Sequence, residues 1–146
     1  MQHQIKKPNV PASSGGKVAT PQIPTTGFIQ FSFKYAQLPA SGKFSIAGQQ
    51  AEYFHELVQK LPTVSNMTTA EFVGKETKAI KNHVIRFPGT SEPGGFSCLN
   101  DTLREQTFGC AHQFGVKRHD YGRVHGFIIR DTFFVVWYDP DHSLYP

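Results

Sequence analysis

The chain has 146 residues, of which 38% are hydrophobic and 13 are phenylalanine, enough apolar volume for one folded domain. Its two cysteines exclude a disulfide-rich scaffold and favour a reducing, cytoplasmic setting. Because it has neither a membrane-length apolar run nor the apolar core of a secretory signal near its N-terminus, we expect no membrane partner.

The net charge of +4 and the pI of about 9.1 suggest a nucleic-acid partner. The charge is distributed unevenly, however. Residues 1–26 contain three lysines and no acidic residue, whereas the remaining chain has 12 basic and 11 acidic side chains. Any affinity for anions must therefore come from a local cluster of basic groups and not from a global positive field.

Residues 1–26 are rich in proline, glycine and serine and poor in large apolar side chains. Such a composition buries too little surface to offset the entropy lost on ordering, so we predict a disordered basic arm. The arm either keeps the protein soluble or contacts RNA or a partner. Residues 27–146 are predicted to form the single globular α+β domain.

The first elements follow from the spacing of apolar residues. Apolar side chains alternate over residues 28–35, which predicts a half-buried strand, and residues 43–46 are a second, short extended candidate. Residues 49–61 have the spacing of an amphipathic helix, which Pro62 is expected to end. The expected buried stripe consists of Phe54, Leu57, Val58 and Leu61.

A second helix is predicted to begin near Thr68, because Thr68 and Glu71 have the spacing of a capping box. It should run toward Lys78 or Lys81. Residues 83–87 are predicted to form a strand, and the proline- and glycine-rich stretch 88–95 is predicted to be a loop.

The C-terminal part contains a short predicted helix and three predicted strands. Residues 99–105 form the helix, with Asn100 or Asp101 as its cap. The predicted strands are 112–117, 123–129 and 132–138, with a tight turn at Arg130-Asp131 before the last. Residues 133–137 are apolar at every position, so this strand should be central and covered on both faces.

Basic and imidazole side chains gather around the middle strand of this C-terminal sheet. Arg123 and His125 lie one pleat apart on the same strand face, near the turn that carries Lys117, Arg118 and His119. A guanidinium can bind a phosphate in a bidentate manner, and an imidazole can transfer a proton near neutral pH. Alternatively, this region is a solvated hairpin tip with a buried, hydrogen-bonded histidine.

A second polar group follows the last strand and consists of Asp139, Asp141, His142 and Tyr145. A histidine and a tyrosine at a rigid strand end suit acid–base chemistry; equally, this segment could be a tail that closes the core. With His125 these residues could supply metal ligands. The chain lacks the paired spacing of zinc sites, however, so we predict no metal site.

Two further kinds of site are not favoured by the sequence. Cys98 and Cys110 have no spacing to a histidine that would select either of them as a nucleophile. The glycine-rich stretch 93–95 lacks the lysine and the spacing of a phosphate-binding loop, and we expect no cofactor.

The segment GRVHGFIIRDTFFVVW, residues 122–137, resembles the C-terminal sheet of the RelE/ParE/YoeB superfamily of small bacterial toxins. Arg123 occupies the position of the arginine in the middle strand of that sheet, and Asp131 the acidic turn. His142 and Tyr145 lie in the terminal region, where one branch of the superfamily ends in an adjacent His-Tyr pair. The predicted order of a strand, two helices and then strands also agrees.

The resemblance implies an α+β fold with an antiparallel sheet of four or five strands and two helices packed on one face. It also implies a metal-independent endoribonuclease that cuts RNA, in some cases on the ribosome, with an antitoxin protein as a possible partner. Arg123 would stabilise the charge on the phosphorus centre, and His125 or His142 would act as base or acid. Tyr145 would stack a base or assist proton transfer. The residues expected to hold the RNA backbone are Arg86, Lys117, Arg118 and His119.

Residues 31–146 are also similar to a family of uncharacterised bacterial proteins, to which we attach no activity. A second hypothesis is therefore a non-catalytic protein-interaction module of a bacterial defence, plasmid or phage system. Its basic arm and aromatic surface would then engage another protein.

Overall fold

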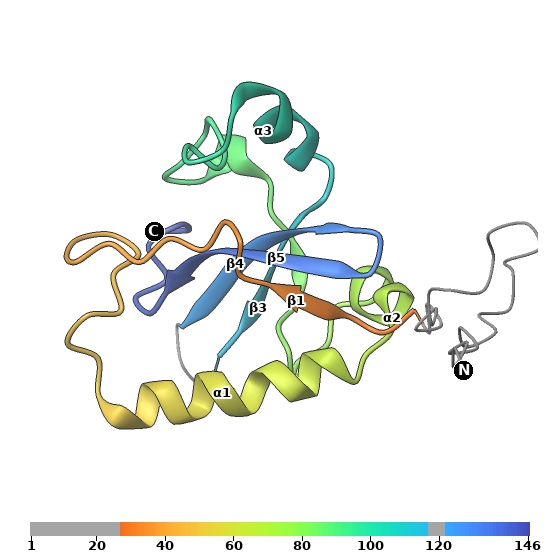
Figure 1. The fold of residues 1–146 in the computed structure, drawn as a ribbon, viewed down its shortest axis with the longest axis horizontal. Coiled ribbons are helices and arrows are strands. Elements are labelled where there is room, and N and C mark those ends of the chain that lie inside the picture. Colours follow the sequence, from red (N-terminus) through yellow and green to blue (C-terminus); the bar gives the residue numbers. More distant parts are fainter. Residues whose placement is uncertain (1–26, 117–121) are drawn as a thin grey trace, which may run out of the picture.

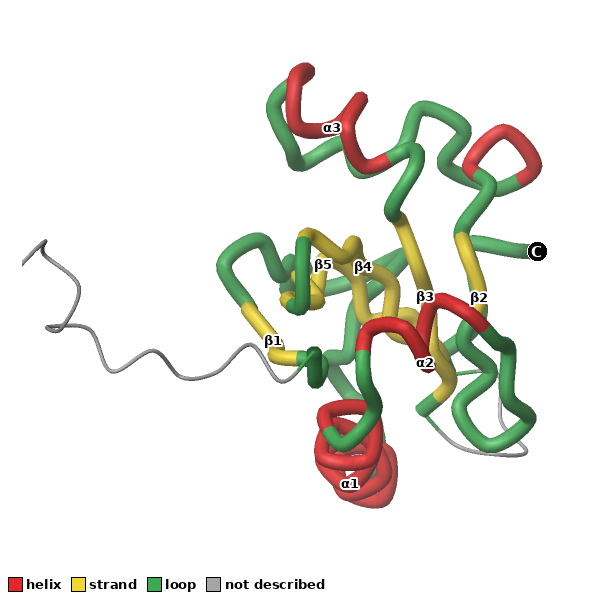
Figure 2. The backbone as a smooth tube through the Cα atoms, turned by 90° about the vertical axis from the view of Figure 1, so that its right-hand side faces the viewer, coloured by secondary structure: helices red, strands yellow, loops and turns green. Residues whose placement is uncertain are grey.

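The computed structural model describes residues 27–116 and 122–146. Its strands form one sheet in the order β1-β5-β4-β3-β2 (Figures 1 and 2). The strands are β1 (Gln30–Ser32), β2 (His83–Val84), β3 (Ala111–Gly115), β4 (Arg123–Ile129) and β5 (Thr132–Asp139). The helices are α1 (Ala51–Ser65), α2 (Thr69–Gly74) and α3 (Asp101–Thr107), with a short 3₁₀ helix at Phe87–Gly89.

The sheet is mixed, because β1 runs parallel to β5 while the other neighbouring strands are antiparallel. The predicted α+β class is confirmed, but the wholly antiparallel sheet that we expected is not present. Alternating apolar residues predict that a segment is extended, and they carry no information on the direction in which it pairs. The central, covered position predicted for the last strand is confirmed, since β5 lies between β1 and β4.

Two apolar layers cover the two faces of the sheet. Helices α1 and α2 lie against one face, as Figure 1 shows, and α3 lies beyond the other face together with residues 87–99 and the C-terminal tail. The α1 layer includes Ile29, Leu57, Val64, Phe72, Phe114, Val124 and Phe133. The α3 layer includes Phe44, Phe87, Phe96, Ala111, Phe127, Val136, Trp137 and Leu144. Two helices therefore pack on one face as predicted, and a third covers the opposite face.

Helix α1 continues through Pro62 to Ser65, so the predicted end before this proline is wrong. A proline has no backbone N–H, so a helix that contains one loses a hydrogen bond. Pro62 lies in the last turn of α1, so the loss is confined to the end of the helix. The extra turn places Val64 in the core with no exposed surface. Burial of this side chain offsets the lost backbone bond.

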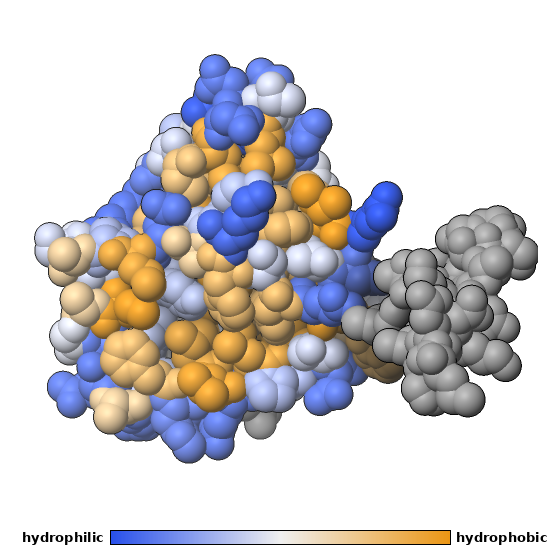
Figure 3. Space-filling view, viewed as in Figure 1, coloured by the Kyte–Doolittle hydropathy of each residue, from blue (hydrophilic) through white to orange (hydrophobic). Residues whose placement is uncertain are grey.

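The predicted buried stripe of α1 is also rotated. Leu57 is buried, but Val58 is 63% exposed and Phe54 is 38% exposed. Leu61 packs against the core as predicted, and Tyr53, which flanks the stripe, packs there as well. Phe54 and Val58 therefore remain as exposed apolar side chains on α1. Figure 3 shows that apolar surface also reaches the lower part of that view, where α1 lies.

The predicted caps decide where α2 and α3 begin. The Thr68 hydroxyl accepts a hydrogen bond from the Glu71 backbone N–H at 3.0 Å, which confirms the predicted start of α2. The helix ends at Gly74, earlier than expected, since the buried Asn82 amide donates to the Phe72 and Lys75 carbonyls at 2.5 and 2.8 Å. The Asn82 side chain thus takes the place of the backbone N–H groups that would donate to these carbonyls if the helix continued.

Other element bounds also shift by a few residues. Asn100 caps α3 by accepting from the Leu103 N–H at 2.9 Å, so Asn100, of the two predicted candidates, is the cap. The first strand covers only Gln30–Ser32, because the chain turns at residues 34–35. The expected strand 83–87 is cut to two residues by the 3₁₀ helix. Residues 43–44 form a turn and residues 45–46 are irregular, so the second extended candidate is not a strand. No helix in the described part of the chain is long and apolar enough to span a membrane.

Candidate functional site

A buried histidine–carboxylate pair links the ends of β4 and β5. His125 Nε2 lies 2.9 Å from Asp139 Oδ2, and neither side chain has any exposed surface. The backbone N–H of Ser143 donates to Asp139 Oδ1 at 2.7 Å, and that of Leu144 donates to Asp139 Oδ2 at 3.0 Å. The carboxylate therefore holds the C-terminal tail against the sheet, with three donors to two oxygens.

A β-bulge brings these two side chains to the same face. His125 pairs with Trp137 across the strands, but the next residue, Gly126, pairs with Val135, so Val136 is an additional residue in β5. Val136 and Trp137 consequently both belong to the α3 layer. The register shift turns Asp139 toward the face that carries His125, whereas strict alternation from Phe133 would have placed Asp139 on the α1 side.

The pair consists of an ionised carboxylate and a neutral imidazole. Burial lowers the pKa of His125, and this effect outweighs the hydrogen bond that His125 donates to Asp139, which raises that pKa. Burial raises the pKa of Asp139, but the hydrogen bonds from His125, Ser143 and Leu144 together hold that pKa below its ordinary value. His125 Nδ1 is buried without a hydrogen-bond partner in the described part of the chain, as suits an unprotonated nitrogen.

These pKa shifts predict that the protein loses stability on mild acidification. The pKa values of His112, His125 and His142 all lie below the ordinary value of 6.5, with burial as the largest cause. Below pH 6.5 the unfolded chain therefore binds more protons than the native state, and the free energy of unfolding falls. We expect a lower urea midpoint at pH 5.5 than at pH 7.5, with a smaller difference in His142→Asn. An equal or higher midpoint at pH 5.5 would contradict this.

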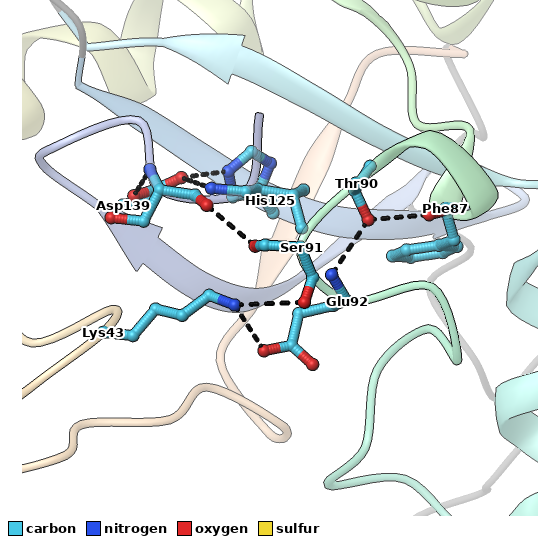
Figure 4. A network of polar contacts seen from close by, with 9 residues as sticks. Lys43, Phe87, Thr90, Ser91, Glu92, His125 and Asp139 are labelled. Atoms are coloured by element: carbon cyan, nitrogen blue, oxygen red, sulfur yellow. Dashed lines mark hydrogen bonds and ion pairs between the residues drawn. The ribbon is translucent and has the colours of Figure 1, made fainter. Parts of the chain in front are cut away.

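A series of hydrogen bonds extends from the buried pair to the surface, as Figure 4 shows. The Ser91 hydroxyl donates to the Ser143 carbonyl at 2.7 Å, and the Ser91 N–H donates to the Leu144 carbonyl at 2.8 Å. Lys43 then donates to the Ser91 carbonyl at 3.3 Å and pairs with Glu92 at 2.7 Å. These contacts hold Ser143 and Leu144 against Ser91, and Lys43 holds Ser91 in turn. They thereby fix the position of Tyr145, which follows Leu144 directly.

Beyond the buried pair, four half-buried side chains from three segments lie close together: His83, Arg123, His142 and Tyr145. We refer to them as the Arg123–His142 cluster. The Tyr145 ring centroid lies 5.8 Å from that of His83 and 5.9 Å from that of His142. Figure 2 shows the C-terminal end of the chain beside β2, where His83 lies.

Positive charge is concentrated around His142. Burial is the main cause of its lowered pKa, and the charges of Arg123, His83 and Lys81 lower it further, whereas Asp139 raises it. Lys81 reaches this area because its stem lies across Gly115, the residue that pairs with Arg123. A neutral imidazole among cationic groups can accept a proton from a substrate whose negative charge the cations attract.

Backbone and side-chain contacts fix the members of the cluster. His83 Nδ1 lies 2.9 Å from the Val84 carbonyl, and its Nε2 lies 2.6 Å from the Gln113 amide nitrogen. Arg123 Nη1 donates to the Gly122 carbonyl at 2.9 Å. His142 has a positive φ of 56°, in the left-handed region, so its imidazole is presented from a tight turn.

The structure brings together three of the predicted catalytic residues, Arg123, His142 and Tyr145. The fourth, His125, lies next to them but is fully buried, where it is hydrogen-bonded to Asp139. Arg86 is exposed, and its backbone N–H donates to the Tyr145 hydroxyl at 3.2 Å. The other residues predicted to bind RNA, Lys117, Arg118 and His119, lie outside the described residues.

Sequence reasoning missed two members of this region, His83 and Lys81. Both lie far from the C-terminal strands in sequence. The pairing of β2 with β3 places this segment beside the C-terminal strands. The only available signal was the polar start of the predicted strand 83–87. Cys98 and Cys110 are free thiols whose pKa values burial raises, which does not favour a nucleophilic role.

No family model matches the chain, and neither a curated protein nor a solved structure matches it.

Proposed function

We propose that the Arg123–His142 cluster cleaves single-stranded RNA without a metal ion, as the resemblance to the RelE/ParE/YoeB toxins implies. One observation carries the proposal. An arginine, a histidine of lowered pKa and a tyrosine converge from β4 and the tail on one half-buried surface. These groups supply a base, a proton donor and a cation, which together suffice for cleavage of an RNA phosphodiester.

In the proposed reaction, neutral His142 removes the proton from a ribose 2′-hydroxyl. The 2′-oxygen attacks the adjacent phosphorus, a new P–O bond forms, and the bond to the 5′-oxygen breaks. Tyr145 donates a proton to the leaving oxygen, and the Arg123 guanidinium stabilises the charge that develops on the phosphoryl oxygens. His125 acts as a positioning residue, because it holds Asp139 and thereby the turn that presents His142.

The cleavage test uses a labelled single-stranded RNA in the presence of EDTA, with the all-deoxy oligonucleotide of the same sequence beside it. We expect fragments that end in a 2′,3′-cyclic phosphate from the RNA, and an intact deoxy strand. His142→Asn should reduce the rate about a hundredfold or more, because it removes the base. Asparagine tolerates the left-handed backbone at this position, so the fold should persist.

His55→Asn is the matched control, since His55 is exposed on α1, away from the cluster, and this variant should cleave as the wild type does. Intact RNA with the wild type, or full activity in His142→Asn, would overturn the nuclease proposal. By extension of the resemblance, we propose that the enzyme acts in the cytoplasm, on RNA at the ribosome, under the control of an antitoxin protein.

The second candidate is the non-catalytic interaction module. Exposed apolar side chains favour it, namely Phe33 at 50%, Phe54 at 38% and Val58 at 63%. The cleavage test separates the two candidates. Intact RNA, together with unimpaired growth of cells that express the wild type, would leave the interaction module as the better description.

A further inference from the structure

An apolar pocket lies beside the Arg123–His142 cluster. It has a volume of about 370 Å³, near the lower end of the range for small-molecule sites. The residues that line it are Val84, Ile85, Arg86, Phe87, Pro88 and Phe108. Phe108 is 41% exposed, whereas Phe87 is buried, so Phe108 is the aromatic ring that a ligand can reach.

The pocket and the cluster share a backbone contact. Arg86 lines the pocket, and its N–H donates to the Tyr145 hydroxyl at 3.2 Å. Val84, another lining residue, follows His83 directly, and its carbonyl oxygen lies within hydrogen-bond distance of His83 Nδ1. A chain that lies in the cluster can therefore place its next unit in the pocket.

The position of the Phe108 ring is fixed from two sides. Its centroid lies 5.2 Å from that of Phe87, with an interplanar angle of 63°, a favourable edge-to-face geometry. On another side lies Gly95, where an added Cβ would approach the Phe108 ring to 3.0 Å. A ring held in this way offers a stacking surface that loses little freedom when a ligand binds.

These features match the chemistry of a nucleobase. Bases are flat and stack on aromatic rings, and the guanidinium of an exposed arginine can stack on a base or bind a phosphate. Pocket walls that are apolar apart from Arg86 favour stacking over readout of base edges.

We propose that this pocket holds one nucleobase of a single-stranded RNA whose backbone lies in the Arg123–His142 cluster. The inference rests on the proposed function, because the cluster supplies the phosphodiester subsite. Base stacking on Phe108 would position the neighbouring phosphodiester, with little preference for one base over another.

Binding of a 2′-O-methyl RNA tests the pocket without cleavage, because this RNA lacks the attacking hydroxyl. Fluorescence anisotropy compares a short labelled strand with an otherwise identical strand that is abasic throughout. We expect the wild type to bind the base-containing strand about tenfold more tightly, equivalent to about 1.4 kcal/mol. Phe108→Ala should lose that difference, and Phe108→Trp should keep it.

Ile129→Ala is the matched control, since Ile129 is also 41% exposed but lies at the far end of β4 from Arg123. It should bind both strands as the wild type does. Thermal denaturation of each variant verifies that it is folded, and Phe108→Leu separates loss of the ring from loss of apolar volume.

Equal binding of the two strands by the wild type, or an undiminished difference in folded Phe108→Ala, would overturn the pocket proposal. No binding of either strand would overturn it as well. If RNA is cleaved but binding does not depend on the bases, only the pocket proposal fails. If binding depends on the bases and on Phe108 but RNA stays intact, only the nuclease proposal fails.

Discussion

Asp139→Asn is expected to lower the free energy of unfolding by about 3–5 kcal/mol, because it breaks a fully buried, charge-assisted network. Asparagine keeps the shape of the side chain but replaces one acceptor oxygen by an N–H₂ donor. One of the donors from His125, Ser143 or Leu144 must then face another donor without access to water. Urea denaturation at pH 7.5 measures the loss.

Asp141→Asn provides the matched control, since Asp141 lies two residues further along and is exposed. The same change of charge there should alter the free energy of unfolding by less than about 0.5 kcal/mol. Comparable losses in the two variants would mean that net charge, and not the buried network, is responsible.

Gly126→Ala should destabilise the protein by about 3 kcal/mol or more, because β4 and β5 approach too closely there for any side chain. A Cβ at this position would collide with the Phe134 backbone carbonyl and lie 2.6 Å from the Phe133 ring. A backbone atom of the neighbouring strand cannot move aside unless the β4–β5 pairing opens. Thermal and urea denaturation would show the loss.

The corresponding control is Gly74→Ala, at the end of α2, where an added Cβ has no neighbour within 4 Å. This variant should be neutral or up to about 1 kcal/mol more stable, because alanine favours a helix over glycine. A loss at Gly74 as large as the loss at Gly126 would show that the close approach of the strands is not the cause.

Local signals in the sequence predicted the parts of the fold that local chemistry decides. Thr68 and Asn100 cap helices because their side chains reach backbone donors three residues ahead. The bounds of β4 agree with the prediction, since a two-residue turn at Arg130-Asp131 fixes its end. The apolar run from 133 to 137 correctly predicted a central strand, because only burial on both faces tolerates it.

Long-range contacts decided the features that the sequence did not reveal. The additional residue at Val136 follows from the close approach of Gly126 to β5, which no pattern in either strand alone indicates. The early end of α2 depends on Asn82, which lies eight residues after the helix. Likewise, we expected His142 to lie near Arg123, because both belong to the closing hairpin and the tail that follows it. The position of His83 beside them depends on the register of β2 on β3, which the sequence does not show.

The parallel pairing of β1 with β5 also has a consequence for the order of folding. Residues 30–32 pair with residues 132–134, so the first strand of the sheet finds its partner only when the last strand has been synthesised. During translation, Phe31 and the apolar surface of α1 must wait while the intervening segments leave the ribosome. Such a topology has a high contact order, which slows folding and prolongs exposure of aggregation-prone surface to chaperones.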